Sequence, residues 1–93
     1  MTEERRNELN EKLARLCMSN MERAKDFQNP NNTEADLVRL AREGYAEGLE
    51  QIAVHMELGQ IGFAHMVAGG QLEFEEFIIN HGGTVDDLKP AVV

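Results

Sequence analysis

Positive charge is missing from the second half of this chain. No lysine or arginine occurs from Glu43 to Leu88, whereas residues 1–33 carry six acidic and six basic side chains, which cancel. The net charge of −8 therefore comes from the second half. Because a surface rich in carboxylates repels phosphates, we expect no direct binding of DNA or RNA through residues 43–88.

Cysteine and long apolar runs are also scarce. Cys17 is the one cysteine, which excludes a disulfide within the chain and is typical of a reducing compartment. No stretch approaches the roughly 18 apolar residues of a membrane helix, and the charged start of the chain is followed by no apolar signal segment. We therefore expect a cytoplasmic protein, folded as one domain over residues 1–93.

Amphipathic helices are predicted for the first two thirds of the chain. Apolar residues recur at three- and four-residue steps through residues 9–27 and again through 37–56. Thr2 and Thr33 are expected N-caps, and the Asn- and Pro-containing segment 29–32 is a strong stop. We predict helices over about 3–28 and 34–57, paired as a long antiparallel hairpin.

Glycine divides the remainder into shorter pieces. We predict helices at about 60–68 and 71–81, with Gly82 as a cap, and a short capped turn at 84–88. A strand is the alternative for 71–79, although the adjacent Glu75 and Glu76 break the alternation that a strand needs. The predicted fold class is all-α: a long antiparallel helical hairpin plus two short C-terminal helical segments.

Metal and catalytic motifs are incomplete. Residues 70–78 resemble the second half of an EF-hand, but His65, Val67 and Gly69 stand where the first three calcium ligands belong. No histidine has a second histidine or cysteine at the spacing of a zinc site, and Cys17 lies on a predicted apolar stripe. We therefore predict no metal, no cofactor and no enzymatic activity.

A helix-turn-helix is also disfavoured. Residues 51–56 resemble its first helix, but Glu57 stands where the turn glycine belongs, and the segment that would read DNA has no lysine or arginine.

Small residues on the second predicted helix indicate a close helix contact. A glycine inside a helix costs about 1 kcal/mol relative to alanine, so Gly44 and Gly48 need a structural reason. Packing within the chain is one interpretation, and a symmetric homodimer contact is the other. The expected dimer contact consists of Ala41, Gly44, Tyr45, Gly48 and Leu49.

The acidic residues suggest a protein partner. We predict a non-enzymatic regulator or inhibitor that docks an acidic surface on a basic partner, with a nucleic-acid-processing enzyme as one such partner. By analogy of size and charge alone, small phage inhibitors that mimic nucleic acid have this character. The alternative function is a homo-oligomeric structural or assembly module built on Gly44 and Gly48. The predicted partner-binding residues are Glu43, Glu47, Glu50, Glu57, Glu73, Glu75, Glu76, Asp86 and Asp87.

Overall fold

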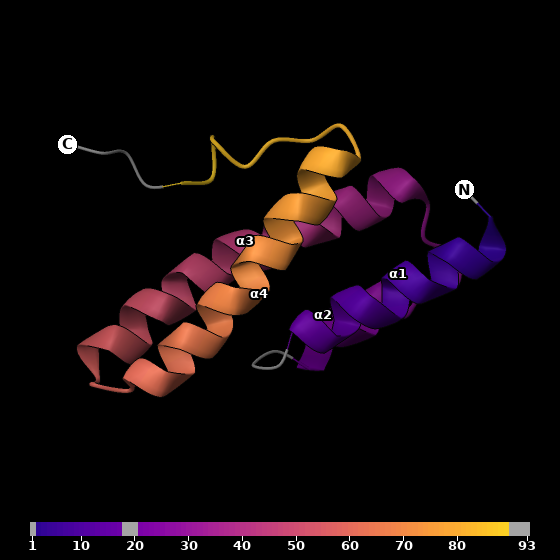
Figure 1. The fold of residues 1–93 in the computed structure, drawn as a ribbon. Helices are drawn as coiled ribbons and strands as arrows, with labels where there is room; N and C mark the ends of the chain where they lie inside the picture. Colours follow the sequence, from indigo (N-terminus) through magenta and orange to yellow (C-terminus); the bar gives the residue numbers. More distant parts are fainter. Residues whose placement is uncertain (1, 18–20, 90–93) are drawn as a thin grey trace.

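The computed structural model describes residues 2–17 and 21–89, and all regular secondary structure in these residues is helical (Figure 1). This confirms the predicted all-α class and a helix, not a strand, at residues 71–79. The helices are α1 (Glu3–Leu16), α2 (Met21–Phe27), α3 (Glu34–Glu57) and α4 (Ile61–Asn80).

The expected continuous helix over 3–28 is not formed. Helix α1 ends at Leu16, because Cys17 leaves helical geometry at φ −90° and ψ 46°. Helix α2 runs back along α1, and the side-chain amide of Asn10 donates to the backbone oxygen of Asn29 at 3.4 Å.

The reversal between α1 and α2 has a clear physical reason. In one straight helix, Leu13 and Phe27 would lie about 21 Å apart along the axis. Folding back places both in the same core, where they are 1% and 0% exposed. The free energy gained by burying two large side chains is several times the free energy that the extra helical turns would contribute.

Helices α3 and α4 form the antiparallel hairpin of the fold, side by side in Figure 1. Helix α3 begins at Thr33, whose hydroxyl accepts from the Asp36 N–H at 3.2 Å while the Asp36 carboxylate accepts from the Thr33 N–H at 3.0 Å. The expected N-cap at Thr33 is confirmed and forms a reciprocal capping box with Asp36. The hairpin partner of residues 34–57 is α4, rather than the expected helix over 3–28.

Helix α4 is continuous through Gly69 and Gly70, so the two expected segments 60–68 and 71–81 are one helix. Both glycines keep negative φ. Gly70 lies against the end of α1, where an added Cβ would be 3.9 Å from Leu16. Packing against α3 and α1 therefore outweighs the low helix propensity of the glycine pair. Positive φ occurs instead at Gly59 and Gly82, in the turns before and after α4.

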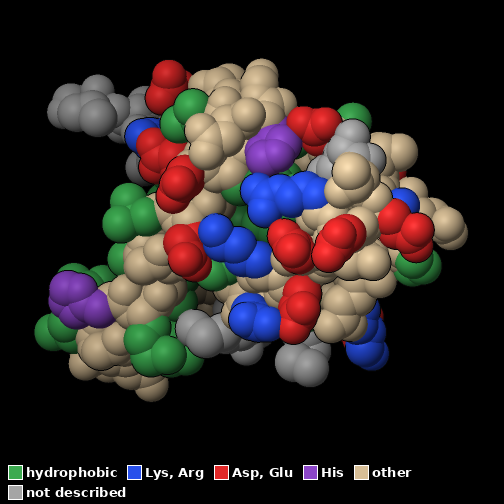
Figure 2. Space-filling model, turned by 45° about the vertical axis from the view of Figure 1, so that its right-hand side comes forward, with side chains coloured by type: hydrophobic (Ala, Val, Ile, Leu, Met, Phe, Trp, Pro, Cys, Tyr) green, Lys and Arg blue, Asp and Glu red, His purple; other side chains and the backbone are tan. Residues whose placement is uncertain are grey.

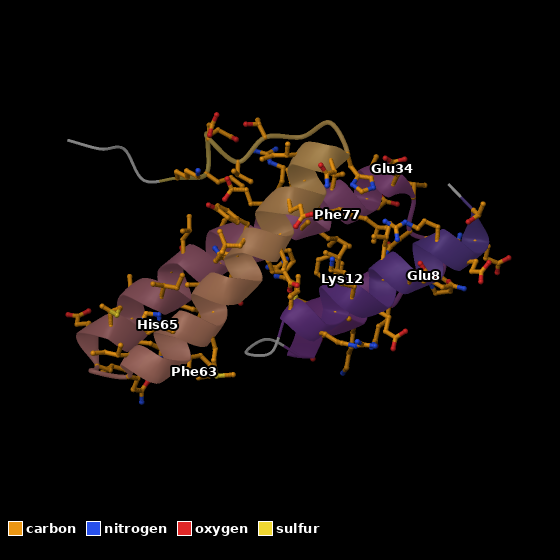
Figure 3. The ribbon with its side chains drawn as sticks, in the orientation of Figure 1. Glu8, Lys12, Glu34, Phe63, His65 and Phe77 are labelled. Carbon is orange, nitrogen blue, oxygen red and sulfur yellow. The ribbon has the colours of Figure 1, made fainter. Side chains whose placement is uncertain are left out.

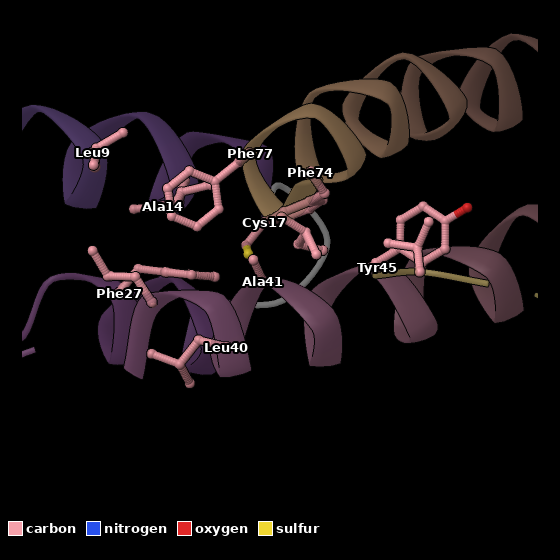
Figure 4. Close-up of a cluster of buried hydrophobic side chains, with 13 residues drawn as sticks. Leu9, Ala14, Cys17, Phe27, Leu40, Ala41, Tyr45, Phe74 and Phe77 are labelled. Carbon is pink, nitrogen blue, oxygen red and sulfur yellow. The ribbon is translucent and has the colours of Figure 1, made fainter. Parts of the chain in front are cut away.

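One core joins all four helices and the segment that follows α4 (Figure 4). The rings of Phe27 and Phe74 stack with centroids 6.2 Å apart. Val85 follows α4 and is 2% exposed, which fixes the turn at residues 84–88 against the core. The largest fully buried side chains are Phe27, Leu13, Leu37, Ile78 and Val85.

Candidate functional site

The acidic surface predicted on α3 is partly neutralised by a cation from α2. Arg23 donates from Nη1 to Glu43 at 2.9 Å and from Nε to Glu47 at 2.7 Å. Its side chain is 21% exposed, and that of Glu47 is 25% exposed. Partial burial disfavours the charged guanidinium, but the hydrogen bonds to Glu47 and Glu43 outweigh that effect and raise the pKa of Arg23. These two carboxylates therefore hold α2 on the hairpin.

Two more of the predicted carboxylates are paired within the chain. Arg42 on α3 forms an ion pair with Asp87, and Lys89 lies 3.5 Å from Glu75. Both pairs join the segment after α4 to the hairpin. Across the middle of the face in Figure 2, basic side chains accordingly lie between acidic ones.

The other predicted carboxylates are exposed and make no ion pair within residues 2–17 and 21–89. Two of them, Glu73 and Glu76, line a shallow groove opposite Arg5 and Lys12 of α1. Ion pairs within the chain thus neutralise some of the acidic residues of the second half. The carboxylates that stay available to a partner are Glu50, Glu57, Glu73, Glu76 and Asp86.

The small-residue strip of α3 is covered by α4 of the same chain. A Cβ on Gly44 would lie 3.1 Å from the Phe74 ring, and one on Gly48 would lie 2.1 Å from the Gln71 side-chain oxygen. The Gln71 amide donates to the Tyr45 backbone oxygen at 2.7 Å, which locks the contact. Of the expected dimer contact, Ala41, Gly44, Tyr45 and Gly48 are buried and Leu49 is partly buried. We therefore assign this strip to packing within the chain.

Cys17 lies beside a cavity of about 30 Å³ that is lined by residues of all four helices. Burial raises the pKa of its thiol to about 11, although the positive charge of Arg23 opposes the shift. The thiol is therefore protonated at neutral pH. The cavity has room for a water molecule or two, but not for an organic substrate.

The feature that the sequence interpretation missed is the hairpin end, where α3 and α4 extend beyond α1 and α2 (Figure 1). Phe63 and His65 mark it in Figure 3, and apolar side chains surround a histidine there in Figure 2. Its exposed apolar side chains are Val54, Met56, Leu58, Ile61 and Met66, which are 49% to 65% exposed, and Leu72, further along α4, is 71% exposed.

A sequence signal for the hairpin end was available. The fifteen residues from Leu58 to Leu72 contain no Asp, Glu, Lys or Arg, in a chain that is 28% charged. Solvated helix faces carry charged side chains, so a stretch of this length without them indicates a contact surface.

The geometry defines a small helical domain with an apolar end that carries few charges and a partly neutralised acidic surface. Comparison of the chain with protein-family models, with curated proteins and with solved structures gave no match. No described helix is long and apolar enough to cross a membrane. Within the described residues, no three His, Cys, Asp or Glu side chains lie together as a metal site would require.

Proposed function

We propose that this chain is a non-enzymatic protein-binding module whose contact surface is the hairpin end. The observation that carries the proposal is the set of exposed apolar side chains on the last turns of α3 and the first part of α4, in a chain that has no charged residue from Leu58 to Leu72. Exposed apolar patches that lie together on a small protein mark interaction sites more often than ordinary surface. The raised pKa of the Cys17 thiol and the small volume of the neighbouring cavity support the non-enzymatic part of the proposal.

In a second candidate function, the protein binds its partner through the acidic surface. Five predicted carboxylates, Glu50, Glu57, Glu73, Glu76 and Asp86, are exposed without an ion pair in the described part of the chain. In this candidate the protein is a regulator or inhibitor that docks these residues on a basic partner, for example a nucleic-acid-processing enzyme.

Affinity capture from the cells that make this protein separates the two candidates. The immobilised wild type is compared with two double variants at exposed positions: Met56→Ser with Leu72→Ser at the hairpin end, and Glu73→Lys with Glu76→Lys on the acidic surface. We expect the first variant to lose the captured protein and the second to keep it. The opposite pattern would reject the hairpin end and favour the basic partner.

Salt gives an independent readout of the same experiment. Binding through carboxylates weakens steeply as ionic strength rises, because exposed charges are screened over about 10 Å at 0.1 M salt. Binding through the hairpin end depends on apolar burial, so we expect the captured protein to resist high salt.

A further inference from the structure

We infer that residues 82–89, which we call the strap, open and close as one unit over an apolar strip of the α3–α4 hairpin while the four helices stay folded. The inference does not depend on the hairpin end, because the strap lies near the opposite end of the two helices. Figure 1 shows the strap running from the end of α4 back along the hairpin.

The strip beneath the strap is formed by Val38 of α3 and Ile78 of α4. A Cβ on Gly83 would lie 3.2 Å from the Val38 side chain and 2.8 Å from the Ile78 side chain, so the strap backbone rests on both. Ile78 is fully buried, and Val38 is partly buried against the core. The closed strap therefore covers apolar surface of both helices.

Apolar burial, rather than backbone hydrogen bonding, holds the strap closed. Within residues 2–17 and 21–89, no backbone hydrogen bond joins residues 84–89 to a helix, and the bond from the Leu88 N–H to the Val85 oxygen lies inside the strap. Val85 is 2% exposed, and Leu88 is partly buried against the core. The other large, fully buried side chains belong to the four helices, so we expect the helices to stay folded when the strap opens.

Two ion pairs add a weak latch. Arg42 of α3 pairs with Asp87, and Lys89 lies 3.5 Å from Glu75 of α4. The four side chains are 28% to 54% exposed, and an exposed pair changes an equilibrium constant by at most about fivefold. The latch therefore shifts the balance between the closed and the open strap without locking it.

The geometry beside the strap leaves it room to move. Gly82 has φ +86°, and a Cβ there would meet nothing within 4 Å, so the chain can rotate at the start of the strap without a clash. Open grooves of about 500 Å³ and about 450 Å³ separate parts of the strap from α3, the first beside Gly83 and the second beside Leu88. The α3 side of the strap is therefore loosely packed.

Native-state amide hydrogen exchange, followed by NMR on the full chain, tests the inference. The strap probes are the N–H groups of Gly83, which donates to the Ile78 oxygen at 2.9 Å, and of Leu88. The N–H of Ala41, which is fully buried on α3, reports on the helices. We expect the protection of the two strap amides to be at least about a hundredfold lower than that of Ala41 and to respond little to low urea.

Two variants test whether the strap opens as one unit. Val85→Ala removes apolar burial and should lower the protection of Gly83 and Leu88 equally, by about tenfold or more. Asp87→Asn should lower both by about two- to fivefold. The matched control Asp86→Asn should change neither, because that exposed carboxylate makes no ion pair in the described part of the chain.

A third variant separates opening of the strap from unfolding of the protein. Arg23→Met weakens the packing of α2 on the hairpin, and this packing is the same whether the strap is closed or open. It should therefore lower the protection of Ala41 at least about fivefold and leave that of Gly83 and Leu88 unchanged. An equal loss at all three amides would overturn the inference, because the strap would then open only with the whole protein. Unequal responses of Gly83 and Leu88 to Val85→Ala would overturn it as well, because the two ends of the strap would then open separately.

Discussion

Replacement of Gly48 by alanine should destabilise the protein, although alanine is the better helix former. Helix propensity alone predicts a gain of about 1 kcal/mol for Gly→Ala inside a helix. At Gly48 the new methyl group would lie 2.1 Å from the Gln71 oxygen and 2.6 Å from its Cδ, so the amide must move. Gln71 is 7% exposed and donates to the Tyr45 backbone oxygen, so moving it leaves a buried amide without its partner. That loss costs about 1–3 kcal/mol, and crowding adds a similar amount.

The two costs less the propensity gain give an expected free energy of unfolding for Gly48→Ala that is lower by about 1–5 kcal/mol. In a Gln71→Ala background the obstacle is gone, and the same change should stabilise by about 0.5–1 kcal/mol. The control is Gly69→Ala, because a Cβ there would have nothing within 4 Å and only the propensity gain applies.

Urea unfolding followed by far-ultraviolet circular dichroism measures the four members of this double-mutant cycle. We expect a coupling energy between positions 48 and 71 of about 2 kcal/mol or more. Additive effects within about 0.5 kcal/mol would refute the claim that Gly48 is needed for the approach of α4.

Arg23, Thr33 and Cys17 each make a contact whose loss can be measured. Arg23→Met should lower the free energy of unfolding by about 1–2 kcal/mol, because it removes the cation that bonds the partly buried Glu47 and one of the two cations beside the exposed Glu43. The exposed control Arg15→Ala should cost less than about 0.5 kcal/mol in the same urea assay, and equal effects would contradict the role of Arg23. Thr33→Ala should cost about 1 kcal/mol as a lost N-cap. The hydrogen bonds from Thr33 lower the pKa of Asp36 in the folded protein below its ordinary value of 3.8. The stability that they contribute is therefore present above pH 3.8 and is lost as the pH falls through the pKa of Asp36 in the folded protein. NMR titration should show this pKa rising in Thr33→Ala. Cys17 should resist a thiol reagent at pH 8 in the folded protein and react after unfolding, because burial raises the pKa of the thiol to about 11; fast labelling of the native chain would contradict its burial.

Local patterns in the sequence predicted much of the local structure. The N-caps at Thr2 and Thr33 and the stop after Phe27 depend on a few neighbouring residues, and all three are observed. The all-α class followed from apolar periodicity in the same way. Gly69 and Gly70 were misjudged, because helix propensity is a weak preference that packing against α3 and α1 overrides.

The arrangement of the helices and the candidate site depended on contacts between distant residues. An apolar stripe shows that a helix is covered but not by which partner, so the pairing of α3 with α4 could not be read from Gly44 and Gly48. The carboxylates of Glu43 and Glu47 looked available because Arg23 lies 20 and 24 residues away in the sequence. The hairpin end was the exception, since the uncharged stretch from Leu58 to Leu72 was visible in the sequence.

Affinity capture from the cells that make this protein tests the central claim, that the hairpin end is its contact surface. We expect the immobilised wild type to retain a protein that Met56→Ser with Leu72→Ser loses and that Glu73→Lys with Glu76→Lys keeps, because the first pair of changes removes exposed apolar surface and the second reverses charge outside it. A protein kept by the first double variant and lost by the second would contradict the claim.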